Sequence, residues 1–124
     1  MRYMFTIFVD EAARESATEA ETQETDAAYG AYTQEVQEKG ILVAGEGLQP
    51  AATGTTVRVR DGESEVTDGP FAETKEQVAG FYVLECKDLD EALEWAAKIP
   101  GAKNGAIEVR PAIEVEQPSG AATS

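Results

Sequence analysis

Residues 55–68 read Thr-Thr-Val-Arg-Val-Arg-Asp-Gly-Glu-Ser-Glu-Val-Thr-Asp, which is the clearest structural signal in the chain. The pair Asp61-Gly62 favours a tight two-residue turn between two strands. Such a turn sets Arg60 opposite Glu63, so that arginines face glutamates on one side and valines gather on the other. Turn chemistry, charge pairing and apolar pattern therefore all predict the same β-hairpin.

Apolar patterns on either side of the hairpin predict further strands and two helices. Strands are expected at residues 3–9, 41–48, 78–86 and 106–115. One helix is expected to end near Lys39, and a second to begin after Asp88 as its N-cap. The acidic residues 10–26 show little apolar periodicity and predict a solvated loop running into the first helix, while residues 73–77 predict one helical turn.

Without the hairpin, the order of elements is βαββαβ, the pattern of a ferredoxin-like α+β sheet with two helices on one face. The other face of such a sheet is bare. Met4, Phe8 and one side of residues 78–86 would then be exposed apolar surface. A second copy of the chain covering this face would remove that exposure, so the sequence predicts a homodimer.

The amino-acid composition indicates which classes of partner and which cellular compartment to expect. The 124 residues are enough for one domain, and 10 Lys and Arg against 24 Asp and Glu give a net charge of −14. Such a chain repels nucleic acid and anionic membranes, so neither is an expected partner. The single cysteine, Cys86, and the lack of a membrane-length apolar stretch or signal-peptide pattern predict a cytoplasmic protein.

The sequence contains no histidine. This excludes Ser-His-Asp and Cys-His catalysis and histidine-ligated metals, so an acid or base would have to be Asp, Glu, Lys, Tyr or Cys. We find no Gly-rich phosphate loop and no cluster with metal-ligand spacing, and we expect no cofactor. Carboxylate-only binding of magnesium or calcium stays open.

One string links the chain to a known family. Asp68-Gly69-Pro70-Phe71-Ala72-Glu73-Thr74-Lys75-Glu76, followed by Gly80-Phe81-Tyr82, resembles the signature of the DGPF subgroup of YCII-related proteins. Gly45-Glu46-Gly47-Leu48 and Ile107-Glu108-Val109-Arg110-Pro111 are similar to other parts of that family. The resemblance covers residues 2–115 and indicates a domain at 1–116 with a flexible tail at 117–124.

The resemblance implies a dimeric α/β barrel built from ferredoxin-like subunits, with a pocket between sheet and helices. Members of that superfamily include lactone isomerases and small monooxygenases, and some DGPF proteins occur beside or fused to sigma factors. Some YCII-related proteins carry a His-Asp pair proposed as catalytic. Since histidine is absent here, only an aspartate such as Asp68 could remain of that pair.

The candidate site residues each have a functional and a structural interpretation. Asp68, at a strand end before a Gly-Pro turn, is the candidate catalytic acid, or its carboxylate shapes the turn. Candidate ligand-binding residues are Tyr29, Tyr32, Glu46, Phe71, Lys75 and Arg110. Tyr29 and Tyr32 lie on the inward helix face, as pocket wall or as core. Arg110 could hold an anionic ligand or pair with an acid on a neighbouring strand. Lys75 could line a pocket mouth or lie in an exposed turn, Phe71 could line a cavity or belong to the core, and Glu46 could point into a cavity.

Three functions fit these residues. The first is a dimeric protein that binds a small molecule in the barrel pocket. The second is a cofactor-free enzyme acting on a small organic acid or lactone, with Asp68 transferring a proton. The third is a protein-interaction module linked to sigma-factor regulation.

Overall fold

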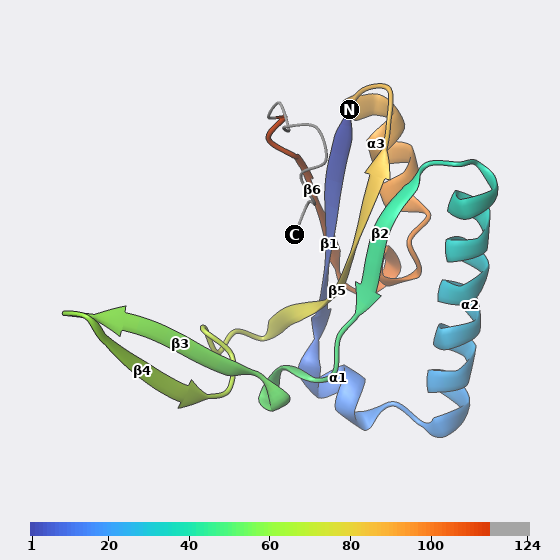
Figure 1. Cartoon of the computed structure of the whole chain (residues 1–124). Coiled ribbons are helices and arrows are strands. Elements are labelled where there is room, and N and C mark those ends of the chain that lie inside the picture. Colours follow the sequence, from blue (N-terminus) through green and yellow to red (C-terminus); the bar gives the residue numbers. More distant parts are fainter. Residues whose placement is uncertain (115–124) are drawn as a thin grey trace.

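A computed structural model of the chain describes residues 1–114 and shows a four-stranded antiparallel sheet with its two long helices on one side (Figure 1). The strands are β1 (Arg2–Asp10), β2 (Leu42–Gly47), β3 (Thr55–Arg60), β4 (Glu63–Asp68), β5 (Glu76–Glu85) and β6 (Ala106–Pro111). The helices are α1 (Glu11–Ser16), α2 (Glu19–Glu38) and α3 (Leu89–Ala97), with single 3-10 turns at Ala51–Thr53 and Pro100–Lys103.

The sheet has the order β2-β5-β1-β6, and β3 and β4 form a separate two-stranded ribbon. Removing that ribbon leaves β1, α2, β2, β5, α3 and β6, which confirms the predicted ferredoxin-like α+β fold. Within the described residues no helix is both long and apolar enough to cross a membrane.

The core lies between the sheet and the two long helices. Phe5 of β1 is opposite Tyr82 of β5 and Val109 of β6, and it is fully buried. Tyr32 of α2 packs its ring 5.1 Å from that of Tyr82 and 6.2 Å from that of Trp95. Burying each such large side chain contributes about 1.5–3 kcal/mol. This packing fixes the positions of α2 and α3 on the sheet.

The opposite side of the sheet is mostly apolar and partly exposed to solvent, as expected. Met4 is paired with Val83, Thr6 with Phe81 and Phe8 with Val78, so these side chains share one face. Met4 is 39% exposed and Val78 37% exposed. Figure 1 shows α2 and α3 on the other side. We call this surface the bare face; it consists of Met4, Thr6, Phe8, Val78, Phe81 and Val83.

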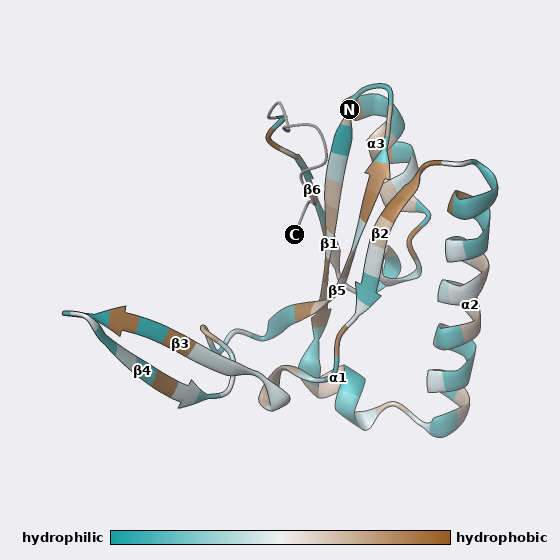
Figure 2. Ribbon diagram, viewed as in Figure 1, coloured by the Kyte–Doolittle hydropathy of each residue, from teal (hydrophilic) through white to brown (hydrophobic). Residues whose placement is uncertain are grey.

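The hairpin has the predicted strands, turn and register. We call its residues 55–68 the arm. It projects from the body in Figure 1, and alternating apolar bands cross it in Figure 2. Its two ends meet, because Gly69 N–H donates to Gly54 O at 2.7 Å and the Thr56 hydroxyl donates to Gly69 O at 2.9 Å.

The predicted loop at residues 10–26 was wrong, since helix α1 and the first turns of α2 fill that range. Asp10 caps α1 by accepting hydrogen bonds from Ala12 N–H and Ala13 N–H. Thr18 and Glu21 form a reciprocal capping box on α2. Low apolar periodicity in this range reflects an exposed helix, because the described buried residues of α2 lie only in its second half.

Two smaller expectations also change. Residues 73–77 form no helical turn; the Gln77 side chain donates to Ala72 O and Thr74 O, and β5 begins at Glu76. The last strand ends at Pro111 instead of residue 115. The predicted tail at residues 117–124 lies outside the described residues.

Candidate functional site

A cleft of about 1120 Å³ lies between α2 and the helix-facing side of the sheet. We call it the α2 cleft. Its walls come from α1, α2, β2, β5 and the turn at Pro100–Lys103. Tyr29, Thr33 and Tyr82 bring hydroxyl groups to it, while Leu42 and Ala79 bring apolar surface.

Part of the cleft floor lacks side chains, because three glycines of the sheet line it. Gly45 lies opposite Tyr82, and Gly47 lies opposite Gly80, on the side of the sheet that faces α2. A Cβ at Gly80 would lie 2.7 Å from the carbonyl oxygen of Glu46, whereas a Cβ at Gly47 would meet no atom within 4 Å. Open space therefore remains above Gly47 in the floor of the cleft.

The hydroxyl groups in the cleft are arranged as hydrogen-bond donors. The Tyr29 hydroxyl accepts from Gly101 N–H at 3.0 Å, so its own proton is free to donate. The hydroxyls of Thr33 and Tyr82 are 2.7 Å apart, and only one of their two protons is used between them. A tyrosine is protonated at neutral pH, and burial moves the pKa of Tyr29 further above its ordinary value.

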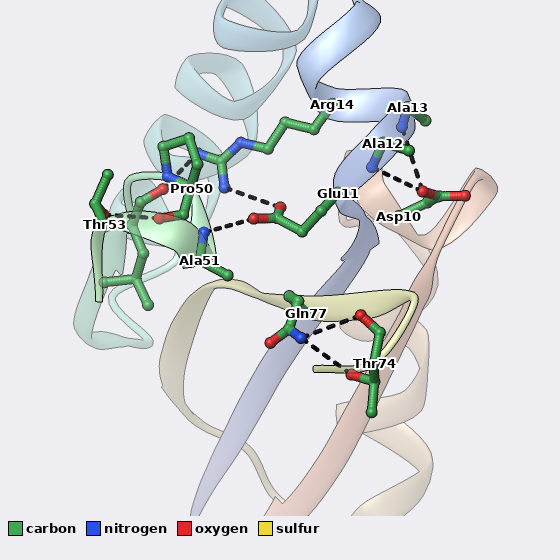
Figure 3. Close-up of polar contacts among 11 residues, drawn as sticks. Asp10, Glu11, Ala12, Ala13, Arg14, Pro50, Ala51, Thr53, Thr74 and Gln77 are labelled. Carbon is green, nitrogen blue, oxygen red and sulfur yellow. Dashed lines mark hydrogen bonds and ion pairs between the residues drawn. The ribbon is translucent and has the colours of Figure 1, made fainter. Parts of the chain in front are cut away.

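One side of the cleft is held by a polar clasp, drawn in Figure 3. Glu11 accepts a hydrogen bond from Ala51 N–H, and Arg14 donates to Leu48 O. The guanidinium of Arg14 lies 3.7 Å from the carboxylate of Glu11, and these side chains are 33% and 23% exposed. Helix α1 is thereby tied to the segment that follows β2.

Comparison with known proteins identifies the family. The sequence pattern of the YCII-related domain matches residues 1–116. The chain belongs to the YCII-related family. An uncharacterised protein of Rhizobium meliloti (strain 1021), R00369, is 37% identical over 113 residues, which cover 90% of this chain and 91% of that protein. The DGPF subgroup stays a prediction from residues 68–76.

Two of the predicted site residues contact the α2 cleft of this YCII-related domain, and one is in the core. Tyr29 lines the cleft directly. Glu46 borders it on β2, but its pairing with Phe81 places it on the sheet face opposite to Gly45. Tyr32 is 4% exposed and its hydroxyl donates to Trp95 O at 2.9 Å, which is a packing contact.

Phe71 and Lys75 lie elsewhere in the YCII-related domain, near the base of the arm. Phe71 lines a second cavity of about 610 Å³, and the guanidinium of Arg58 sits 4.8 Å above its ring. The ammonium of Lys75 is exposed and lies 3.8 Å from the carboxylate of Asp10.

The last two predicted residues line neither cavity. Arg110 pairs with Glu108 on β6 at 2.9 Å and is opposite Met4, so it lies at the border of the bare face. Asp68 ends β4 opposite Thr55, exposed on the arm. The structure therefore separates the predicted set into several places. Among residues 1–114, no three His, Cys, Asp or Glu side chains are close enough to hold a metal ion.

Sequence reasoning did not assign Thr33, Tyr82 or Arg14 to the site. Thr33 carries a weak signal, because it shares a helix face with Tyr29. Tyr82 follows Gly80 in an apolar strand, and a glycine there indicates close backbone approach. Arg14 gave no signal, because its partner carbonyl at Leu48 is 34 residues away.

Proposed function

We propose that this YCII-related domain binds a small organic molecule in the α2 cleft and works as a homodimer. The observation that carries the proposal is the pair of free hydroxyl protons above a glycine floor. Neutral donors of this kind suit a carbonyl or carboxyl oxygen, and the apolar walls suit a short carbon skeleton. The cleft volume of about 1120 Å³ is slightly larger than the roughly 300–1,000 Å³ of most small-molecule sites.

Binding is better supported than proton transfer. Asp68 is exposed on the arm and outside the cleft lining, so the enzyme alternative gains no support from its position. The raised pKa of Tyr29 favours donation of a hydrogen bond over release of a proton. A module for a different protein, such as a sigma-factor partner, would have to use the bare face that a homodimer covers.

The homodimer is supported by the apolar bare face, which a second copy would remove from water. The cytoplasm is the proposed compartment, since the single cysteine, Cys86, is a buried thiol and suits a reducing environment.

A thermal-shift screen with small ketones, lactones and carboxylic acids tests the cleft. A ligand at about ten times its Kd should add about 1.4 kcal/mol and raise Tm by about 5 °C. Tyr82→Phe removes a hydroxyl, and Gly47→Leu fills the floor at a position with open space. Both variants should lose most of the shift.

The matched control is Tyr3→Phe, which removes a hydroxyl from the same side of the sheet but outside the cleft lining. It should keep the full shift. A ligand that shifts Gly47→Leu as much as the wild type binds elsewhere and would refute the proposed site. A screen with no shift, followed by native mass spectrometry of an empty protein, would refute binding of these compound classes.

A further inference from the structure

We propose that the first half of α2, with the link before it, is a strap that opens and closes the α2 cleft by bending at Gly30. We call residues 17–28 the strap; they comprise the link Ala17-Thr18 and the part of α2 that begins at Glu19. The inference rests on the ligand site of the proposed function and adds to it the movement by which a molecule enters.

The strap borders the cleft without being buried. Thr22 and Thr25 line the cleft from the side of the strap, while β2 and β5 line it from the sheet. Every residue from 17 to 28 is nevertheless exposed to solvent. The buried side chains of α2, Tyr32 and Val36, both lie in its second half. Apolar burial therefore anchors only that half of the helix to the sheet.

Polar contacts show the same division of the helix. In the second half, the Tyr32 hydroxyl donates to Trp95 O at 2.9 Å, and Glu35 pairs with Lys98 at 3.4 Å. Among the described residues, no hydrogen bond or ion pair joins residues 17–28 to any element beyond α1 and α2. A helical segment of this length without tertiary contacts is marginally stable by itself, so little holds the strap in one position.

Gly30 lies at the boundary between the two halves. A Cβ at this position would meet no atom within 4 Å, so no neighbour requires a glycine there. Glycine inside a helix is destabilising relative to alanine, because its backbone loses more freedom on folding. A glycine that weakens the helix and makes room for no close contact suits a position at which the backbone bends.

A small bend is enough to change the cleft. The helix from Glu19 to Gly30 is about 16 Å long at ~1.5 Å per residue. A bend of about 20° would therefore move the start of the helix by about 6 Å. The open space above Gly47 leaves room for such a movement. Because the cleft of about 1120 Å³ is larger than most small-molecule sites, closure would bring it into their usual range.

The other end of the strap allows this movement while keeping it in register. In Figure 1 the chain runs from α1, at the lower end of the sheet, to the lower end of α2, and the clasp ties α1 to the segment after β2. The link Ala17-Thr18 has extended backbone, which can absorb a change in direction. The capping box of Thr18 and Glu21 keeps the first turn helical, so the strap moves as a helix.

Double electron–electron resonance between two spin labels tests the strap. One sample carries Glu19→Cys on the strap and Glu94→Cys on α3, and the matched control carries Glu38→Cys and Glu94→Cys, so both ends of α2 are compared with the same point. All three positions are exposed, whereas the native Cys86 is buried and shielded from the label. Labelled chains are diluted with unlabelled chains, so that only distances within one chain contribute.

We expect the distance distribution of the Glu19 pair to be wider than that of the Glu38 pair by about 6 Å. Gly30→Ala should narrow it to the width of the control. Equal widths for the two pairs would overturn the strap, and a wide Glu19 pair that Gly30→Ala leaves unchanged would overturn bending at Gly30. These distances need no ligand, so a compound screen without a hit counts against the proposed function alone.

Far-UV circular dichroism checks that the labelled variants fold. If one does not, hydrogen exchange of the unlabelled chain decides between the outcomes. Faster exchange of the backbone amides of residues 23–28 than of residues 34–38, slowed by Gly30→Ala, supports the strap. Equal exchange in the two halves of α2 overturns it.

Discussion

The clasp between α1 and the segment after β2 allows a quantitative prediction. Glu11→Ala removes the acceptor for Ala51 N–H and leaves the charge of Arg14 without its carboxylate. Oε2 of Glu11 and Nη1 of Arg14 are shielded from solvent and have no hydrogen-bond partner, so each is balanced only by the charge of the other at 3.7 Å. An uncompensated, partly buried charge is destabilising, so each single substitution removes a hydrogen bond and also leaves the other charge unpaired.

The magnitude follows from the exposure of the pair. Hydrogen bonds to charged groups contribute about 1.5–3 kcal/mol when buried. Because Arg14 and Glu11 are 33% and 23% exposed, the lower part of that range applies. We expect losses of about 2 kcal/mol for Glu11→Ala, 1.5 for Arg14→Ala and 2.5 for the double variant. The coupling energy is then about 1 kcal/mol.

Urea unfolding followed by the fluorescence of Trp95, the single tryptophan, measures these free energies. Glu15→Ala is the matched control, since Glu15 is an exposed acid on the same helix. It should change stability by no more than about 0.5 kcal/mol. A Glu11→Ala variant as stable as this control, or a double variant whose loss equals the two single losses together, would refute the reasoning.

Two further predictions concern Cys86 and the glycines. Burial raises the pKa of Cys86 from 9.0 to about 11, so above pH 9 the unfolded chain loses a proton that the folded chain keeps, and stability falls up to pH 11. Cys86→Ala should reduce this fall, as measured by urea midpoints across that range; an unchanged slope would contradict it. A Cβ at Gly105 would lie 2.0 Å from Phe8 O. Gly105→Ala should therefore cost at least about 2 kcal/mol, against less than about 1 for Gly47→Ala, in thermal unfolding; equal costs would show that the backbone yields.

The sequence predicts those parts of the fold that depend on neighbouring residues. The arm was predicted with its register because the Asp61-Gly62 turn determines which residues face each other. The prediction of a loop at residues 10–26 was wrong because it relied on apolar periodicity, which a helix exposed to solvent does not need. The local signal was present, since Thr18 and Glu21 have the spacing of a capping box.

The site was harder to predict because it depends on pairing between distant strands. Tyr82 lies opposite Gly45 only after a register shift between Leu42 and Ala44, which the local sequence does not specify. Asp68 and Phe71 are close in sequence, but the positive φ of Gly69 (+100°) turns the chain between them. Asp68 and Phe71 therefore do not line the same pocket, although they are neighbours in the motif.

The two ends of the arm meet at its base, which determines where the length of the chain can change without altering the main sheet. Because Gly54 and Gly69 are joined by a hydrogen bond, the polypeptide leaves the body and returns to it at a single point. The residues between them add no strand to the four-stranded sheet β2-β5-β1-β6, so the arm is an insertion into that fold. A change in the length of this segment would leave every residue that lines the α2 cleft in place.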